Sequence, residues 1–390
     1  MKMKWIALAL VFGCALSAGA VEVTVKDTDI RLQIYGYIRA DLSYDAQSTV
    51  PGELGFYVLP EVDGEKSGKT HFTARETRFG LNLFGPDFDH WKTSGKIEMD
   101  FYGGGTDMAY TPRIRIGYID LAHSSGFSFR AGQDWETFIE VIPRIVNFSY
   151  LADAGALGLR RPQARVTQEI KISDATKVVA KAALARTVGQ DLDGGGFDDG
   201  ANAEWPTAQF NLALHQKLWM EKTARLAVSG HYGQETIDAV DEDGKVVKTK
   251  VEDFDTWSIQ GSLFLPLTKC LAVQGNLWAG ENLDVYYGGI GQGVNMDLAT
   301  GIAAKGGWAQ VLWDPTEKLC FAAGYSMDDP DDEDLNAGMR SKNEVILVNG
   351  SYKLTKAVTM MAEYSHFKTG YLEGEDAESD RVQLAMRYMF

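Results

Sequence analysis

The sequence predicts an all-β protein, a 16-stranded antiparallel transmembrane β-barrel. Polar and apolar residues alternate with a period of two along most of the chain, as in strands with one watery and one apolar face. The chain has 41 glycines against 10 prolines, with 16 tyrosines and 18 phenylalanines, which favours many tight turns and aromatic girdles. Short and long connections alternate between the predicted strands.

Hydropathy alone would miss such a barrel. The mean hydropathy of −0.19 is that of a soluble protein. A β-barrel gives the same average, because half of each strand faces water. Beyond the N-terminus no stretch approaches about 20 continuous apolar residues, so we expect no transmembrane helix.

The N-terminus predicts export. Lys2 and Lys4 precede an apolar run over 5–16, and Ala18-Gly19-Ala20 is a small-residue cleavage site. This pattern is typical of a secretory signal peptide over 1–20. We then expect a short periplasmic segment over 21–29 and the barrel domain over 30–390. Lipoprotein processing at Cys14 is an alternative that Phe12 fits poorly.

The charge balance excludes one class of partner. The formal charge is −16, and loss of Lys2 and Lys4 with the signal peptide makes it −18. That balance argues against nucleic-acid binding. The acids gather in the predicted long loops: Asp191, Asp193, Asp198, Asp199, Asp238, Asp241, Glu242, Asp243, Asp328, Asp329, Asp331, Asp332, Glu333, Asp334, Glu373, Glu375, Asp376 and Glu378.

The acidic loops have two interpretations. One is a solvated outer surface; the other is bridging by divalent cations to lipopolysaccharide phosphates or to neighbouring subunits, since such cations prefer carboxylate oxygens. The run over 191–196 resembles a calcium loop but fails the EF-hand pattern, with Gly195 where Asp or Asn is needed and Asn202 where the bidentate Glu belongs. We therefore predict no metal site.

Two cysteines, Cys270 and Cys320, remain after the signal peptide. A disulfide is the first guess for an exported protein. Both lie at the same end of the predicted barrel, with one strand between them. Strands two apart are separated by roughly 10 Å, which is beyond disulfide reach. We expect two free thiols.

The first predicted strand defines the two faces of the barrel wall. Leu32, Ile34 and Ile38 alternate with Arg31, Tyr35 and Arg39. The second face is too charged for a soluble core and too regular for a loop, and it suits a water-filled lumen.

The same alternation continues to the last residue. The other strands are expected near 71–84, 96–101, 113–116, 127–131, 162–172, 176–187, 206–217, 223–234, 254–265, 270–281, 299–313, 318–327, 341–354, 357–368 and 380–390. The phase becomes unclear after Gly117, which indicates a bulge. Pairing of 381–390 with 31–45 would close the ring, and the outward aromatic girdle would include Trp313, Tyr352, Tyr388 and Phe390.

Connection lengths predict which side each end of the barrel faces. The short turns include 123–125, 173–175, 266–268, 314–316 and 354–356, and we expect them on the periplasmic side. The long connections are 46–69, 134–161, 188–205, 235–253, 282–298, 328–340 and 369–379, and we expect them to be extracellular. This sorting is typical of an outer-membrane barrel in a Gram-negative bacterium.

The inward faces are rich in charged side chains. By strand parity the inward groups include Arg39, Arg78, Glu98, Asp100, Arg113, Arg115, Arg130, Arg161 and Arg165. Arginine binds carboxylate or phosphate through two nitrogens, so such a wall can contact anions. The alternative is that these arginines only pair with inward acids and keep the wall rigid.

The chain carries no motif of a known catalytic centre. Gly-x-Ser-x-Gly, His-Glu-x-x-His and Gly-x-x-x-x-Gly-Lys are all absent. The six histidines are scattered, although His215 and His231 could face the lumen on adjacent strands. An outer-membrane phospholipase would need a Ser–His pair on the lipid face, which we cannot place. The glycine-rich run over 288–293 is interpreted as flexible backbone. We expect no enzyme and no cofactor.

The whole pattern resembles the general bacterial outer-membrane porins. The stretch from Gly132 to Phe138 is similar to the segment where porins leave strand five and enter loop three. The resemblance implies that 133–158 folds into the pore as a constriction. Gln133-Asp134-Trp135 and the entry over 160–165 also resemble the DcaP-like branch, which is associated with small anionic solutes. Members with a helical extension before the barrel differ from this chain, since 21–29 leaves no room for one.

The porin resemblance implies a function and its partners. A homotrimer would let small hydrophilic or anionic solutes and ions diffuse passively through the outer membrane, in contact with lipopolysaccharide. Asp134, Glu136 and Glu140 on loop three would face the arginine wall and set a transverse field with a mild anion preference.

Three alternatives remain open. The barrel could be a substrate-selective porin for carboxylates or phosphate. It could be a non-conducting adhesin or structural barrel in the outer membrane. The remaining outlier is a soluble exported β protein.

The resemblance also implies that the barrel-assembly machinery reads the C-terminal strand through Tyr388 and Phe390. Deletion of Phe390 should therefore impair assembly far more than it changes the conductance of the channels that do form. The yield of heat-modifiable trimer in outer membranes, compared with single-channel conductance, checks this. A normal trimer yield would contradict the assignment of the C-terminal strand.

Overall fold

The computed structural model describes residues 21–25, 28–104, 110–192, 194, 198–218, 222–240 and 246–390. The predicted signal peptide and Cys14 lie outside these residues, as do Asp193, Asp241, Glu242 and Asp243 of the predicted acidic loops. The statements that follow concern the described part of the chain.

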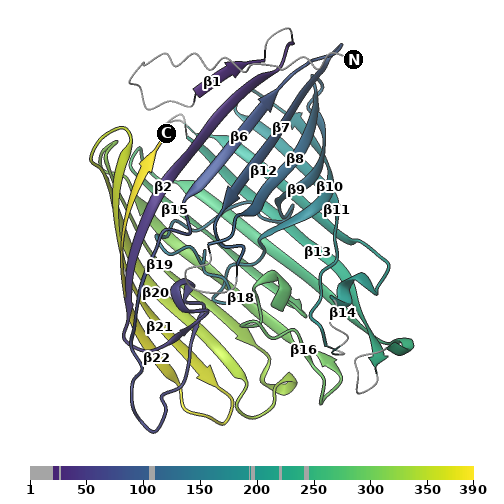
Figure 1. Ribbon diagram of the computed structural model, residues 1–390. Coiled ribbons are helices and arrows are strands. Elements are labelled where there is room, and N and C mark those ends of the chain that lie inside the picture. Colours follow the sequence, from purple (N-terminus) through teal and green to yellow (C-terminus); the bar gives the residue numbers. More distant parts are fainter. Residues whose placement is uncertain are drawn as a thin grey trace, which may run out of the picture.

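The described chain is a closed antiparallel β-barrel (Figure 1). Its staves are β2 (Arg31–Asp45), β5 (Lys69–Thr73) with β6 (Arg78–Phe84), β7 (Trp91–Asp100), β8 (Arg113–His123), β9 (Phe127–Trp135), β10 (Arg160–Lys171), β11 (Thr176–Ala185), β12 (Thr207–Lys217), β13 (Thr223–Val240), β14 (Val246–Pro266), β15 (Leu271–Glu281), β18 (Ala303–Trp313), β19 (Leu319–Pro330), β20 (Arg340–Lys353), β21 (Val358–Tyr371) and β22 (Ala377–Met389). Short pieces outside the staves are β1 (Val21–Thr24), β3 (Thr49–Val50), β4 (Tyr57–Val58), β16 (Val294–Asn295) and β17 (Thr300–Gly301). Four 3₁₀ turns complete the described elements: η1 (Gly52–Leu54), η2 (Asp199–Ala201), η3 (Asp284–Tyr286) and η4 (Asp332–Asp334).

The sixteen staves confirm the predicted fold class, because β5 and β6 follow one another along the same neighbour, β2. The ring closes where β22 pairs with β2, from Met389 opposite Tyr37 to Arg381 opposite Asp45. Phe390 exchanges two further backbone hydrogen bonds with Gly36. Closure leaves the barrel wall without an open sheet edge, as a lipid environment requires.

The strand β1 covers the part of β2 that β22 does not reach. Val21 lies opposite Ile34 and Thr24 opposite Arg31, on the edge just beyond the Phe390–Gly36 pair. The 21–29 segment therefore begins as a strand on the barrel rim.

Three local features differ from the sequence prediction. The predicted strand 71–84 is interrupted between β5 and β6. The bulge lies just before Gly117, where Ile114 and Ile116 face Met99 and Glu98 and leave Arg115 as the extra residue. The predicted loop 235–253 is largely strand, because β13 and β14 continue as a paired ribbon from Ile237 opposite Glu252 to Val240 opposite Val246.

The predictions for the two cysteines and for the outward aromatic residues hold. Cys270 and Cys320 are free thiols. Cys270 directly precedes β15, and Cys320 lies in β19. The strand β18 lies between β15 and β19, as predicted. The predicted girdle residues Trp313, Tyr352, Tyr388 and Phe390 are all exposed. In the described part of the chain, no helix has the length and apolar character needed to cross a membrane.

The outer surface carries the apolar face of the strands. Exposed apolar side chains alternate with buried polar ones, as along β22, where Val382, Leu384 and Met386 are exposed while Arg381 and Gln383 are buried. The same holds on β12 to β14. The outward apolar side chains can contact lipid directly. The inward polar side chains form hydrogen bonds and ion pairs inside the barrel.

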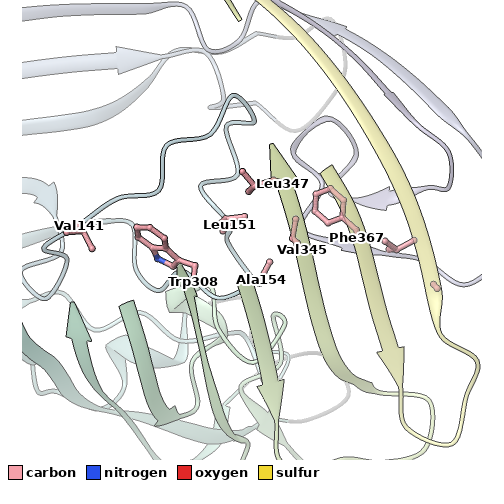
Figure 2. Packing of buried hydrophobic residues seen from close by; sticks show 9 residues of the cluster. Val141, Leu151, Ala154, Trp308, Val345, Leu347 and Phe367 are labelled. Carbon is pink, nitrogen blue, oxygen red and sulfur yellow. The ribbon is translucent and has the colours of Figure 1, made fainter. Parts of the chain in front are cut away.

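Three connections enter the barrel and contact the inner wall: 46–68, 136–159 and 282–302. An apolar cluster joins the second of these to the wall (Figure 2). Val141, Leu151 and Ala154 of 136–159 pack against inward side chains of β18, β20 and β21, namely Trp308, Val345, Leu347 and Phe367. These wall positions are apolar on the lumen face, contrary to the simple polar-inside pattern, because the connection shields them from water.

Uncharged side chains of the wall hold the main chain of 136–159. Successive strands contribute these groups, and the contacts are Gln209 to Thr137 N, Ser229 and Gln260 to Phe138 O, Gln274 to Ile142 O, and Gln310 with Asn349 to the main chain of Arg144. The carboxylate of Glu363 then accepts the N–H groups of Val146 and Asn147. The connection therefore follows the inner wall from β12 to β21.

Leu151 is 3% exposed in this cluster. Leu151→Ala should destabilise the seating of 136–159 by about 2–5 kcal/mol through lost burial and a cavity. Limited proteolysis with mass spectrometry should find faster cleavage within 136–159, while the heat-modifiable migration of the barrel is unchanged. The lipid-facing Leu384→Ala serves as the control. Equal cleavage rates in the two variants would contradict the packing argument.

Candidate functional site

A network of arginines and carboxylates covers the inner wall on β2 and β6 to β10. Arg39 is 4% exposed and is held between Asp41 and Glu76, each at 2.7 Å. Its guanidinium also donates to the carbonyl of Val146, so the wall and the 136–159 connection share one cation. Buried charges require this kind of pairing, since an unpaired one loses its solvation without compensation.

The bulge in β8 places a second bridging arginine. Arg115 is 1% exposed and contacts Glu98 at 3.1 Å and Asp100 at 2.9 Å. Arg113 contacts the same Asp100 at 2.8 Å. The extra residue at the bulge lets Arg115 and Ile116 both turn inward, which strand parity alone does not predict.

The predicted constriction carboxylates contact their arginines directly. Asp134 lies on β9 rather than on the loop, and it contacts Arg130 at 2.6 Å and Arg165 at 2.8 Å. Glu136 contacts Arg161 at 2.8 Å. The expected arrangement had these charges facing one another across the opening. Contact shortens the range of their field, because the opposite charges largely cancel a few ångströms away.

Glu140 contacts basic side chains from three neighbouring strands. Lys181 of β11 lies 3.2 Å from its carboxylate, His215 of β12 lies at 3.1 Å, and Arg225 of β13 lies at 3.8 Å. His215 thus faces the lumen as predicted. Four residues further along the same connection, Arg144 contacts Asp314 of a short turn at 2.6 Å.

Tyrosines complete the wall and were missed as site residues. Tyr35 donates to Glu98 at 2.8 Å and Tyr37 to Glu76 at 3.2 Å. Arg130 lies 3.8 Å from the ring centre of Tyr118, a cation–π contact. Strand parity could have identified Tyr35 and Tyr37, because they occupy the same predicted lumen face as Arg39.

Four arginines of the described chain have a buried guanidinium nitrogen without a hydrogen-bond partner: Arg78, Arg160, Arg381 and Arg387. Of these, Arg381 contacts Asp45 at 3.1 Å, and no carboxylate of a described residue lies within 4.0 Å of Arg387. Arg78 approaches Glu98 only at 3.6 Å, and its Nε and Nη2 are buried without a hydrogen-bond partner. Arg160 has a buried Nη1 without a partner and, among the described residues, no carboxylate within 4.0 Å. The other predicted arginines have at least one carboxylate at 3.1 Å or closer.

Arg160 was missed because strand parity places only its neighbour Arg161 inward. The strand ends turn at this point, so that Trp135 and Arg160 both line interior cavities. The guanidinium of Arg160 lies 4.8 Å from the ring centre of Trp135. One cavity of about 50 Å³ is lined by Arg160 and Arg113 together with residues of all three inward connections.

The glycine-rich run over 288–293 is held in place, contrary to the prediction of flexible backbone. Asp328 accepts the N–H groups of Gly289 and Ile290, at 3.2 and 3.3 Å. Arg340 donates to the carbonyls of Ile290 and Gly291. Gly289 and Gly291 have φ of +65° and +66°, which a side chain would strain.

Buried acids without a cation lie where 136–159 meets this turn. Asp153 is 5% exposed, and its Oδ1 has no hydrogen-bond partner. Burial raises the pKa of Asp153 well above its ordinary value, and the nearby Asp328 raises it further. Burial likewise raises the pKa of Asp284 to about 6. Within the described ranges, no group of three or more His, Cys, Asp or Glu side chains could hold a metal ion.

His231, the other predicted lumen histidine, is fully enclosed. Its Nδ1 lies 2.7 Å from the Ser258 hydroxyl, and its ring centre lies 3.9 Å from that of Tyr286. Phe138 of the 136–159 connection stacks on the same ring. The Ser–His pair thus faces the interior, not lipid, and it helps to hold two inward connections to the wall.

The two residues predicted to act in assembly, Tyr388 and Phe390, are exposed on the outer surface. Tyr388 pairs with Ile38 and Phe390 with Gly36, at the seam that closes the ring. A closed sixteen-stave barrel, apolar outside and lined with ion pairs inside, is the fold of outer-membrane porins.

Solved structures with this fold confirm the resemblance predicted from the sequence. The outer membrane channel DcaP of Acinetobacter baumannii is 20% identical with a TM-score of 0.72, and the match covers 94% of this chain and 99% of that one. An anion-selective porin from Comamonas acidovorans is 11% identical with a TM-score of 0.60, covering 93% of this chain and 100% of the other. OmpF of Salmonella typhi, solved with daunomycin, is 11% identical with a TM-score of 0.57, covering 95% and 100%. No family model matches the chain, and no curated protein matches it.

The raised pKa of Asp153 makes a pH-dependent contribution to stability. The folded protein keeps this proton at pH values where the unfolded chain has released it, so the free energy of unfolding falls as pH rises above about 4. Asp153→Asn imitates the protonated form and should remove the contribution of Asp153 to the decrease in the free energy of unfolding with rising pH. Urea-unfolding midpoints in detergent at pH 4 and pH 8 measure the effect. The exposed Asp174→Asn is the control, and a wild-type pH dependence in the Asp153 variant would contradict the argument.

Proposed function

We propose that this protein is a porin of the Gram-negative outer membrane that passes small hydrophilic solutes and ions by passive diffusion, with a mild preference for anions. We propose no enzymatic activity for it. The 136–159 connection supplies the constriction, and charged groups on the wall beside it filter the solutes that fit. The partners are two further copies in a homotrimer, lipopolysaccharide and the barrel-assembly machinery.

One observation carries the anion preference: among the described residues, Arg160 and Arg387 have no carboxylate within 4.0 Å, and Arg78 approaches Glu98 only at 3.6 Å. The paired arginines and acids largely cancel at a distance, so the unmatched cations dominate what a passing ion experiences. The similar barrel from Comamonas acidovorans is an anion-selective porin, which supports the same direction here.

The seating of 136–159 supports its role as a constriction. It is tied to the wall by side chains from β12 to β21 and meets both other inward connections, since Asn147 donates to Leu54 O and Gly158 to Tyr286 O. A segment held at so many points keeps a constant cross-section, which size exclusion requires.

A second candidate is a substrate-selective porin for carboxylates or phosphate. The small, partly open cavity beside Arg113 and Arg160 favours it, because a discrete site delays a solute, whereas a diffuse field only biases its passage. Saturable block of the ion current by one solute class would distinguish this candidate. A non-conducting adhesin or structural barrel is the third, and stable ohmic conductance steps would exclude it.

Reversal potentials in a potassium chloride gradient across planar bilayers test the proposal. Wild type should favour chloride. Arg78→Gln should lower the chloride-to-potassium permeability ratio by a factor of about two to five, because one unmatched lumen cation is lost. The matched control is Lys305→Gln, which removes the same charge from an exposed, outward-facing position paired with Asp329. A cation-selective wild type would overturn the anion preference while leaving the channel function in place.

A further inference from the structure

We infer that Gln133, on the outer face of the barrel wall, is a positioning residue that holds Arg115 in the lumen and so raises the chloride-to-potassium permeability ratio of the channel. This inference rests on the proposed channel function and goes further, because it assigns part of the selectivity to a side chain outside the lumen. The wall is a single sheet, so an outer side chain can act on the lumen through the backbone of the neighbouring strand.

The side chain of Gln133 points outward from β9. Successive side chains of a strand alternate between the two faces, and its neighbour Asp134 belongs to the ion pairs of the lumen. The outer face of a membrane barrel offers few hydrogen-bond partners, so an amide there is costly unless it is paired within the wall. Gln133 is paired in this way, since its Nε2 donates to the carbonyls of Ile114 and Arg115, at 2.7 and 3.2 Å.

These two carbonyls lie where the regular pairing of β8 stops. The ladder between β8 and β9 runs from Ala122 opposite Ser128 to Gly117 opposite Gln133 itself. On the other side of β8, the bulge at Arg115 interrupts the ladder to β7. The Gln133 amide therefore continues the pairing of β8 with β9 beyond the last ladder pair, at the bulge.

The backbone of β9 brings the amide to this point. Gly132 has a φ of +128°, and a Cβ there would collide with the main chain of Gly117 and would lie 2.7 Å from Cα of Tyr118. Because β9 approaches β8 so closely here, the next side chain, that of Gln133, reaches past Gly117 to Ile114.

The bulge decides which face of the wall Arg115 occupies. Regular alternation from the inward Ile116 would place Arg115 outward, since neighbouring side chains of a strand face opposite ways. In the bulged strand Arg115 contacts Glu98 and Asp100, and its guanidinium lies 5.0 Å from the ring centre of Phe148 in the proposed constriction. Loss of the bulge would remove this cation from the lumen and leave both carboxylates less compensated, which favours cations.

Reversal potentials in a potassium chloride gradient across planar bilayers test the inference. Gln133→Met keeps the length of the side chain and removes the donor, so the chloride-to-potassium permeability ratio should fall by a factor of about two or more, as in Arg115→Gln. The matched control is Gln168→Met, which should leave the ratio unchanged. Gln168 shares the exposed face of β10, and its Nε2 also donates to two carbonyls, those of Ser125 and Glu169. Equal ratios in Gln133→Met and Gln168→Met would overturn the inference.

A double variant tests whether Gln133 acts through Arg115. In channels that carry Arg115→Gln, the further change Gln133→Met should not lower the permeability ratio again, because the cation that the amide positions is already absent. Two effects that multiply would overturn the positioning role. A wild type that prefers potassium would overturn the anion preference of the proposed function instead, and the comparison between variants would still decide the role of Gln133.

A titratable variant covers the case in which Gln133→Met does not fold. Gln133→Glu keeps the size of the side chain, and its carboxyl group donates a hydrogen bond only when it is protonated. Its permeability ratio should match that of the wild type at pH 4 and fall below it at pH 8, whereas Gln168→Glu should follow the wild type at both. Heat-modifiable migration establishes that each barrel has formed before recording. A folded Gln133→Glu channel with the wild-type ratio at pH 8 would contradict the inference.

Discussion

The closure of the sheet between β2 and β22 is the constraint on which the rest of the structure depends. In lipid each backbone N–H and C=O group must be paired within the chain, and only a ring achieves this for a sheet. Once the ring is closed, strand parity decides the environment of each side chain. The outer positions become apolar, and the inner positions receive the charges and amides that the connections then use. The interior network is thus a consequence of closing the wall.

Most of the fold was predictable because period-two alternation is a local signal repeated in each strand. Sixteen strands, the closing pair and the two free thiols followed from it. The local errors have physical causes. The bulge at Arg115 adds one residue and reverses parity, and the pattern showed the loss of phase only after Gly117, past the bulge itself. The ribbon formed by β13 and β14 beyond the barrel rim has no membrane to sort its side chains, so its sequence looks like a loop.

The candidate site was predictable only in part. Strand parity predicted most of the wall arginines, and the resemblance to porins predicted which connection enters the barrel. Neither could give the pairing, because contact between Arg161 and Glu136 depends on how a connection folds in three dimensions. Parity also fails at strand ends, where Arg160 turns inward beside Trp135. The inward apolar positions Val345 and Leu347 are informative in retrospect: a strand that is apolar on both faces must be covered on the lumen side as well.

The short strand β1 affects whether another chain can pair with the edge of the barrel wall. Beyond Phe390, the edge of β2 over 31–34 would expose a row of unpaired donors and acceptors, the kind of template on which foreign strands add and aggregates begin. β1 occupies that row from within the same molecule. That edge of β2 is therefore not available to another chain. The open edge passes to β1, which is only four residues long, and so short an edge is a poor template for strand addition.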